Sequence, residues 1–190
     1  MDKQEHAECV GEFVGLEIEI IQRFLVNLSA AYAGEVKRLD DLISKADDPY
    51  YVDYLGDQQG TESEVLKLGG GLAMVGLYRI IELSTKGLLR PKYKNAADKF
   101  YQYDRLVAKV KKDLSVDIQT LTGSAAVNEI RLINNAVKHD GKVSKELARR
   151  FGQQSGWKQS APLTGLEQAF GRLSPAVPGY LTELAKILLP

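Results

Sequence analysis

The residues best suited to chemistry lie in one short stretch, residues 128–144. Read as a helix at about 100° per residue, its polar members gather on one side. They comprise two cations, an imidazole and two amides, with no carboxylate among them: Asn128, Arg131, Asn135, Lys138 and His139. A cationic surface rich in hydrogen-bond donors favours an anionic ligand such as phosphate. The alternative is that these residues form only the solvated side of a helix.

The ends of this helix can be predicted from its flanking residues. Ser124 is a suitable N-cap. Asp140 and Gly141 follow His139, and Gly often supplies the left-handed conformation that ends a helix. His139 is therefore expected at a helix C-terminus, where the macrodipole favours a protonated imidazole. The other side of the helix should face a core through Ala126, Ile130, Ile133 and Val137.

Two long helical segments precede this stretch. Apolar residues recur at steps of three and four over residues 3–46, which predicts one long helix, or two with a break near Gly34. Asp47–Gly60 combines Pro, Gly, Asp and Tyr and is predicted to be a loop. The capping-box pair Thr61 and Glu64 predicts that the next helix begins there.

The helix that begins near Thr61 should run to about Leu89, because Arg90-Pro91 follows. It contains Gly69, Gly70 and Gly71, each unfavourable in a helix interior by about 1 kcal/mol relative to Ala. Close approach of another helix, or a kink, would explain three successive glycines.

Further helices are predicted over residues 95–113, residues 144–151 and residues 180–189. A passage rich in Gly, Gln, Ser and Pro separates the last two, and Trp157 should anchor it. No alternating pattern of useful length suggests a strand. We therefore predict an all-α helical bundle, with the N-terminal helix and loop of residues 1–60 packed on a bundle of residues 61–190 as a single domain.

Composition indicates an ordinary globular protein of 190 residues with zero formal net charge. No apolar run approaches the length that spans a bilayer. One cysteine, Cys9, excludes an internal disulfide and suits the reducing cytoplasm. His6 lies three residues before Cys9, but two histidines and one cysteine are too few for a metal site without distant carboxylates, so neither metal nor cofactor is expected.

The charges are unevenly distributed along the chain. Residues 1–64 carry 15 acids and 5 bases, whereas residues 86–112 carry 9 bases and 2 acids. Three of these bases follow one another closely, at Lys109, Lys111 and Lys112, with tyrosines nearby. Such a combination suits single-stranded nucleic acid, although a lysine-rich helix face is more often merely solvated. The asymmetry is equally consistent with the acidic part folding against the basic part.

The stretch EIRLINNAVKHDGKVS, residues 129–144, resembles the signature helix of the HEPN superfamily (higher eukaryotes and prokaryotes nucleotide-binding). That helix carries an arginine and, a few residues later, a histidine near its end. RIIELSTKGLL and YLTELAKILL also resemble helices of that family, so the resemblance covers roughly residues 61–190. It implies a HEPN-like bundle and a metal-independent endoribonuclease of toxin or phage-defence type. It also implies a homodimer that joins its two motif helices into one basic cleft, with an antitoxin or other partner protein.

Carried over by position, the resemblance makes His139 the family histidine and Asn135 the polar residue that follows the arginine. The family spacing places its arginine at Asn134, while Arg131 stands seven intervening residues before His139. An active enzyme would use the RNA 2′-hydroxyl as nucleophile, with His139 as general acid or base and Arg131 and Asn135 stabilising the phosphorane. The expected phosphate contacts are Asn128, Asn134, Lys138, Lys109, Lys111 and Lys112. The alternative is an inactive HEPN-like module that binds RNA, a nucleotide or a protein.

Overall fold

The fold is described from a computed structural model that covers residues 2–91, 93 and 103–189. Those residues form seven α-helices and one short 3₁₀ turn, and no strand occurs among them. The predicted all-α helical bundle is therefore confirmed. One continuous hydrophobic cluster receives side chains from every α-helix, so the short helices and the long ones share a core.

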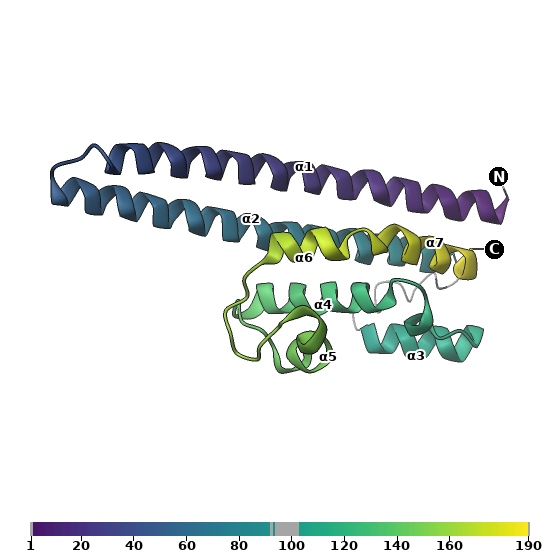
Figure 1. The fold of residues 1–190 in the computed structure, drawn as a ribbon. Coiled ribbons are helices and arrows are strands. Elements are labelled where there is room, and N and C mark those ends of the chain that lie inside the picture. Colours follow the sequence, from purple (N-terminus) through teal and green to yellow (C-terminus); the bar gives the residue numbers. More distant parts are fainter. Residues whose placement is uncertain (1, 92, 94–102, 190) are drawn as a thin grey trace.

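The first two helices form an antiparallel hairpin that is longer than the rest of the molecule (Figure 1). α1 spans Lys3–Ile43 and α2 spans Pro49–Leu89. Three shorter helices pack against the part of the hairpin near the chain ends: α4 (Ser124–His139), α6 (Leu166–Leu173) and α7 (Ala176–Leu188). The half of the hairpin nearest its turn projects beyond them (Figure 1).

The remaining elements are α3 (Tyr103–Leu114), the 3₁₀ turn Ile118–Thr120 and α5 (Lys145–Ser155). Of these, α5 lies on the far side of α4 from the hairpin, while α3 lies beyond the start of α4 and against the end of α2 (Figure 1). Only residues 103–113 of the helix predicted over 95–113 can be compared, because residues 95–102 lie outside the described part of the chain. α4 is thus the central helix, with the hairpin on one side, α5 on the other and α3 next to its start.

α1 is one uninterrupted helix, and Gly34 does not break it. Asp2 caps its start in a capping box with Glu5. The predicted loop over Asp47–Gly60 is wrong, and so is the predicted start at Thr61, because α2 begins at Pro49. The expected division at residue 60 therefore falls inside α2.

Local chemistry explains the early start of α2. The Asp48 side chain accepts a hydrogen bond from the Tyr50 backbone at 3.0 Å, and Pro49 has a backbone angle already suited to a first turn. Packing against α1 then holds the segment in helix: Leu55 is buried, and Gln59 donates to Asp40 at 2.6 Å. Tertiary contact overrides the turn-like composition.

Two of the three successive glycines of α2 lie where another helix approaches closely, whereas the third leaves room for an ordinary contact. A Cβ on Gly69 would overlap Leu28 of α1, and one on Gly70 would lie 3.2 Å from the Cβ of Leu166 in α6. A Cβ on Gly71 would lie 3.6 Å from Val137 of α4. Close helix approach, as expected from the sequence, is therefore confirmed.

The start of α4 depends on Gly123 rather than on Ser124, so the predicted N-cap is corrected. Gly123 is the N-cap at φ +80°, and a Cβ there would lie 2.6 Å from the carbonyl oxygen of Ala176 in α7. Ser124 is the first helical residue, and its hydroxyl donates to the Gln119 carbonyl at 2.6 Å. α6 was not expected: the predicted irregular passage ended near residue 165, and no helix was predicted between it and the last one.

Gly123→Ala should lower the free energy of unfolding by about 2 kcal/mol or more, through left-handed strain and contact with the α7 backbone. Gly34→Ala is the matched control: no atom lies within 4 Å of the added Cβ, so it should raise stability by about 0.5–1 kcal/mol. Urea denaturation of both variants measures the two changes. Equal shifts of the same sign would contradict this account of Gly123.

Candidate functional site

The polar side of α4 divides into two environments. Asn128 is buried, and the side chain of Arg131 is only 13% exposed. Asn135, Lys138 and His139, nearer the C-terminus, are exposed. The five residues share one side of a helix, as predicted, but neighbouring elements cover only the first part of it.

Arg131 is held by contacts with three elements. Its Nε and Nη2 donate to the Asn128 Oδ1 at 3.1 and 3.0 Å. Its guanidinium carbon lies 4.9 Å from the ring centroid of Tyr103 on α3, a cation–π distance, and its Nη2 lies 3.7 Å from the Glu146 carboxylate on α5. These contacts turn Arg131 toward α3 and α5.

A pocket of about 350 Å³ opens beside Arg131, between α3, the start of α4 and α5. This volume falls within the range of about 300–1,000 Å³ usual for ligand sites. Two aromatic rings and several polar side chains surround it: Tyr103, Gln119, Ser124, Ala125, Asn128, Arg150 and Phe151. We call it the α3–α5 pocket.

Three features make the α3–α5 pocket suitable for an anion. Arg131 occupies the Asn128 Oδ1, which directs the Asn128 NH₂ group elsewhere as a donor. The first turn of α4 reaches the pocket at Ser124 and Ala125, and no side chain caps it, so its partial positive charge is available. Arg150 adds a full positive charge.

One carboxylate reduces this positive charge. Glu146 Oε1 lies 3.0 Å from the Arg150 Nε and 3.7 Å from Arg131, so two guanidinium groups share a single acid. Burial raises the pKa of Tyr103, opposed by the charge of Arg131, so its hydroxyl stays protonated as a hydrogen-bond donor at neutral pH. The pocket keeps a local excess of one positive charge among these groups.

The other end of α4 is open. α4 ends at His139, as predicted, and Gly141 follows with φ +64° and donates to the Ala136 carbonyl at 3.0 Å. Asn135 and His139 are exposed one turn apart on the same side. Arg131 precedes His139 by eight positions, about 12 Å along the axis, and points toward α3 and α5. Within one chain, these side chains lie in separate environments.

Asn134, at the position of the family arginine, lies in the core instead of on the surface. It is 1% exposed, so a phosphate cannot reach it, and its Oδ1 has no hydrogen-bond partner. Its NH₂ group makes a long 3.5 Å contact to Asn135. Helical periodicity explains the burial, because position 134 is one turn from Ile130, on the apolar side of the helix.

Two of the three predicted lysines are already paired with carboxylates. Lys109 lies 2.8 Å from Asp113 on α3, and Lys111 lies 2.9 Å from Asp117. Lys112 is exposed. Exposed pairs of this kind are weak, so a polyanion can compete for these lysines.

A buried carboxylate that the sequence analysis did not single out joins α4 to α6. Glu129 is 3% exposed and makes two hydrogen bonds with Arg172, at 2.7 and 3.1 Å, and accepts another from the indole of Trp157 at 2.7 Å. Burial raises the pKa of Glu129, but these donors outweigh it and keep the pKa below its ordinary value. Glu129 is the one acidic residue within α4, and this was the sequence signal that could have indicated a buried, paired carboxylate.

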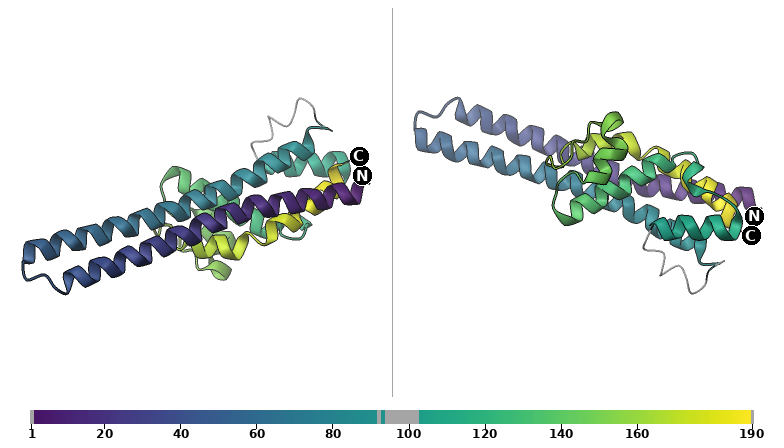
Figure 2. Two further views of the ribbon diagram at one scale, coloured as in Figure 1. Left: turned by 90° about the horizontal axis from the view of Figure 1, so that it is seen from above. Right: turned by 90° about the horizontal axis from the view of Figure 1, so that it is seen from below.

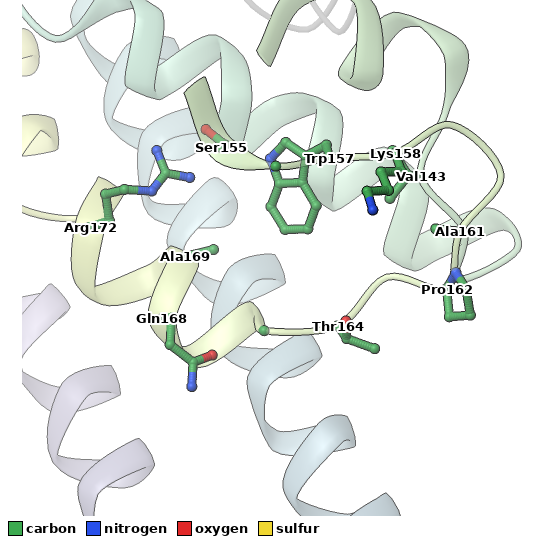
Figure 3. Close-up of a pocket in the computed structure, with 12 residues that line it drawn as sticks. Val143, Ser155, Trp157, Lys158, Ala161, Pro162, Thr164, Gln168, Ala169 and Arg172 are labelled. Carbon is green, nitrogen blue, oxygen red and sulfur yellow. The ribbon is translucent and has the colours of Figure 1, made fainter. Parts of the chain in front are cut away.

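Arg172 and Trp157 also line a second pocket, of about 460 Å³ (Figure 3). Figure 3 shows Arg172 and Gln168 extending from α6, while Trp157 and Lys158 belong to the segment that follows α5. Glu129 already neutralises Arg172, which leaves Lys158 as the remaining cation among the residues that line this pocket. Trp157 anchors the irregular segment, as expected.

Among the described residues, no group of three or more His, Cys, Asp or Glu side chains is arranged to hold a metal ion. A search of the same residues finds no helix with the length and apolarity needed to span a membrane. Comparisons with models of known protein families, with curated proteins and with solved structures yield no match to this chain. The fold defines an all-α bundle built on a long hairpin, and the HEPN resemblance rests on the sequence segments named above.

Removing the partner of Glu129 should destabilise the fold in a pH-dependent way. Arg172→Ala leaves a buried carboxylate without its guanidinium and should cost about 2–4 kcal/mol at pH 7. The folded pKa of Glu129 is lowered, so its stabilisation is present above the ordinary value of 4.5 and is lost as pH falls through the folded pKa. The difference between wild type and variant should therefore shrink below pH 4.5.

Arg23→Ala is the control for Arg172→Ala, because Arg23 makes an exposed pair with Glu19 and its loss should cost under about 0.5 kcal/mol. Urea denaturation from pH 7 to about pH 3 follows both variants. A cost for Arg172→Ala that stays constant over this range would contradict the assigned role of Glu129.

Placing the family arginine at position 134 should damage the protein. Asn134→Arg would bury a charge without a partner and should cost about 3 kcal/mol or more. Asn134→Leu has a similar branched shape, removes the unsatisfied carbonyl and should raise stability by about 1 kcal/mol. Thermal and urea unfolding of the two variants provide the measurement. An Asn134→Arg variant as stable as wild type would show that this position can turn outward.

Proposed function

We propose that this chain is a non-catalytic, HEPN-like binding module that binds single-stranded RNA on the surface formed by α3, α4 and α5. The α3–α5 pocket is the observation that carries the proposal. It combines Arg150, the donor group of Asn128 and an uncapped helix start with two aromatic rings. Phosphates need the first three features, and of the two rings the half-buried Tyr103, unlike the buried Phe151, can meet a base.

The charge distribution supports the same surface. The three helices α3, α4 and α5 carry nine lysines and arginines against four acids, whereas the hairpin helices carry seven against thirteen. A polyanion would be attracted to the former and repelled by the latter. Lys112 on α3 and Lys138 on α4 are also exposed. The single exposed cysteine, Cys9, is consistent with a cytoplasmic protein.

Binding is favoured over cleavage because of where the motif residues lie. Metal-free RNA cleavage needs the imidazole and a cation to act on one phosphate. In this chain Arg131 is occupied by Asn128, Tyr103 and Glu146, and position 134 is buried. A module that only binds phosphate at the start of α4 does not need an imidazole and a cation next to the same phosphorus atom.

The second candidate is the metal-independent endoribonuclease of toxin or defence type. The exposed Asn135 and His139, one turn apart at the open end of α4, favour it. Two copies that placed these ends together would form a shared cleft, with Arg131 reaching the phosphate from one copy or the other. An antitoxin or other partner protein would then cover that cleft.

Removing the positive charge of Arg150 from the α3–α5 pocket should weaken RNA binding. Arg150→Gln should raise the Kd for a labelled single-stranded RNA roughly tenfold and lower the slope of log K against log salt by about one. Arg23→Gln is the matched control, because Arg23 also pairs with a glutamate four residues away, at an exposed site on α1. Fluorescence anisotropy at several salt concentrations gives both quantities. Equal Kd values for the two variants, or no binding at low salt, would contradict the proposal.

The same RNA distinguishes the two candidates when it is incubated with the protein in excess chelator. The binding module leaves the RNA intact. The nuclease would release fragments with cyclic-phosphate ends, and His139→Ala would abolish them. Cleavage that depends on His139 would replace the proposed function with the second candidate.

A further inference from the structure

The first turn of α4 has backbone donors that no group in the described chain occupies. The N–H groups of Ser124 and Val127 donate to backbone carbonyls, each at 3.0 Å. The N–H groups between them, those of Ala125 and Ala126, have no acceptor among the described residues, and no side chain caps the helix. Ala125 lines the α3–α5 pocket. Unpaired donors of this kind are the groups that bind anions at the start of a helix.

A buried amide on the same side of α4 adds a further donor. Asn128 lies one turn after Ala125, is only 8% exposed and also lines the pocket. Its Oδ1 accepts both hydrogen bonds from Arg131, so its other amide atom is the NH₂ group, which has no acceptor in the described part of the chain. An unpaired donor on so buried a residue finds its acceptor in the pocket that the residue lines.

The charge beside these donors is positive. Arg150 lines the pocket, and the described residues that line it include no acid. Glu146, next to the pocket, is shared between Arg131 and Arg150. Glu183 of α7 accepts a hydrogen bond at 2.9 Å from the backbone of Thr122, before α4 begins, and does not line the pocket. The pocket therefore keeps a positive balance, which suits an anion.

Three separate sources of donors distinguish between kinds of phosphate. They are the unpaired first-turn N–H groups of α4, the NH₂ group of Asn128 and the guanidinium of Arg150. A phosphodiester within an RNA strand offers two unbridged oxygens and one negative charge. A terminal phosphomonoester offers three acceptor oxygens and a charge of about −1.5 to −2. Three donor sources with a positive balance match the monoester better.

The pocket has room for one nucleotide instead of a length of strand. Its volume of about 350 Å³ is near the lower end of the range for ligand sites. Arg131 lies over one face of the half-buried Tyr103 ring, so one base can stack on the other face. The view from below in Figure 2 places α4 and α5 in front of the hairpin, so the rest of a strand can leave the pocket on this side.

We infer that the α3–α5 pocket binds the terminal phosphomonoester of a single-stranded RNA. The first-turn N–H groups of α4, Asn128 and Arg150 each bind one of its oxygens, and the terminal base lies beside Tyr103. This inference rests on the proposed function and adds that the RNA is held by an end instead of an internal phosphate. A free mononucleotide carries the same phosphate and is the other source of this chemistry.

The first test compares RNAs that differ only at their ends. Three RNAs of about ten nucleotides share one sequence and one internal label, and carry a 5′-phosphate, a 3′-phosphate or hydroxyl groups at both ends. Fluorescence anisotropy should give a Kd about tenfold lower for one of the phosphorylated RNAs than for the hydroxyl RNA. Equal Kd values for all three would overturn the inference and leave the proposed function standing. No binding of any of them at low salt would remove both.

Competition tests the other source of the phosphate. Because an RNA also contacts the surface around the pocket, displacing the labelled, phosphorylated RNA should need at least about tenfold more nucleoside 5′-monophosphate than unlabelled phosphorylated RNA. Displacement by equal concentrations of the two competitors would overturn the RNA end as the occupant.

The second test changes the buried donor. Asn128→Asp keeps the side-chain size and the acceptor for Arg131, but replaces the NH₂ group with a carboxylate oxygen. The ratio of the Kd for hydroxyl RNA to that for phosphorylated RNA should fall from about ten toward one. Asn27→Asp is the matched control, because it makes the same charge change at an exposed position of α1 and should keep the ratio. Arg150→Gln, at an exposed position, should lower the ratio without disturbing the core. An unchanged ratio in either pocket variant would overturn the inference.

Discussion

The length of the α1–α2 hairpin is the constraint on which the rest of this structure depends. Each helix has 41 residues, whereas α4, α6 and α7 have 16, 8 and 13. The short helices cover one side of the hairpin over part of its length, and Gly70 in α2 lets α6 approach closely. The other side receives nothing from the described chain, yet its sequence keeps large apolar residues there. The hairpin therefore has one face that builds the fold and another that the described chain leaves exposed.

α4 lies at the centre of this arrangement, and its polar residues serve two different purposes. Glu129 accepts hydrogen bonds from Arg172 and Trp157 and so joins α4 to α6 and to the segment after α5. On another side, Asn128 and Arg131 bind each other and contact α3 and α5. These contacts create a pocket at the start of α4. They also separate Arg131 from His139, so the geometry that favours phosphate binding is the same one that opposes cleavage.

Helical periodicity predicted the class of fold, the long first helix and the sides of α4, because each follows from the spacing of apolar residues within one segment. The family motif placed Asn134 among the phosphate ligands, although the spacing of apolar residues in α4 puts that position on the side that faces the core. The segment Asp47–Gly60 has the composition of a loop, and only its packing on α1 explains why it is helical. Glu129 could not be assigned a role before α6 was known. Contacts between distant segments decided each of these cases.

The two ends of α4 bear on the choice between binding and cleavage. The α3–α5 pocket, at the start of α4, is lined by residues of one chain alone. A shared cleft between two motif helices would instead need two copies to meet at the exposed end of α4. Phosphate binding at the pocket therefore needs one chain, whereas the cleavage that the family motif implies needs two.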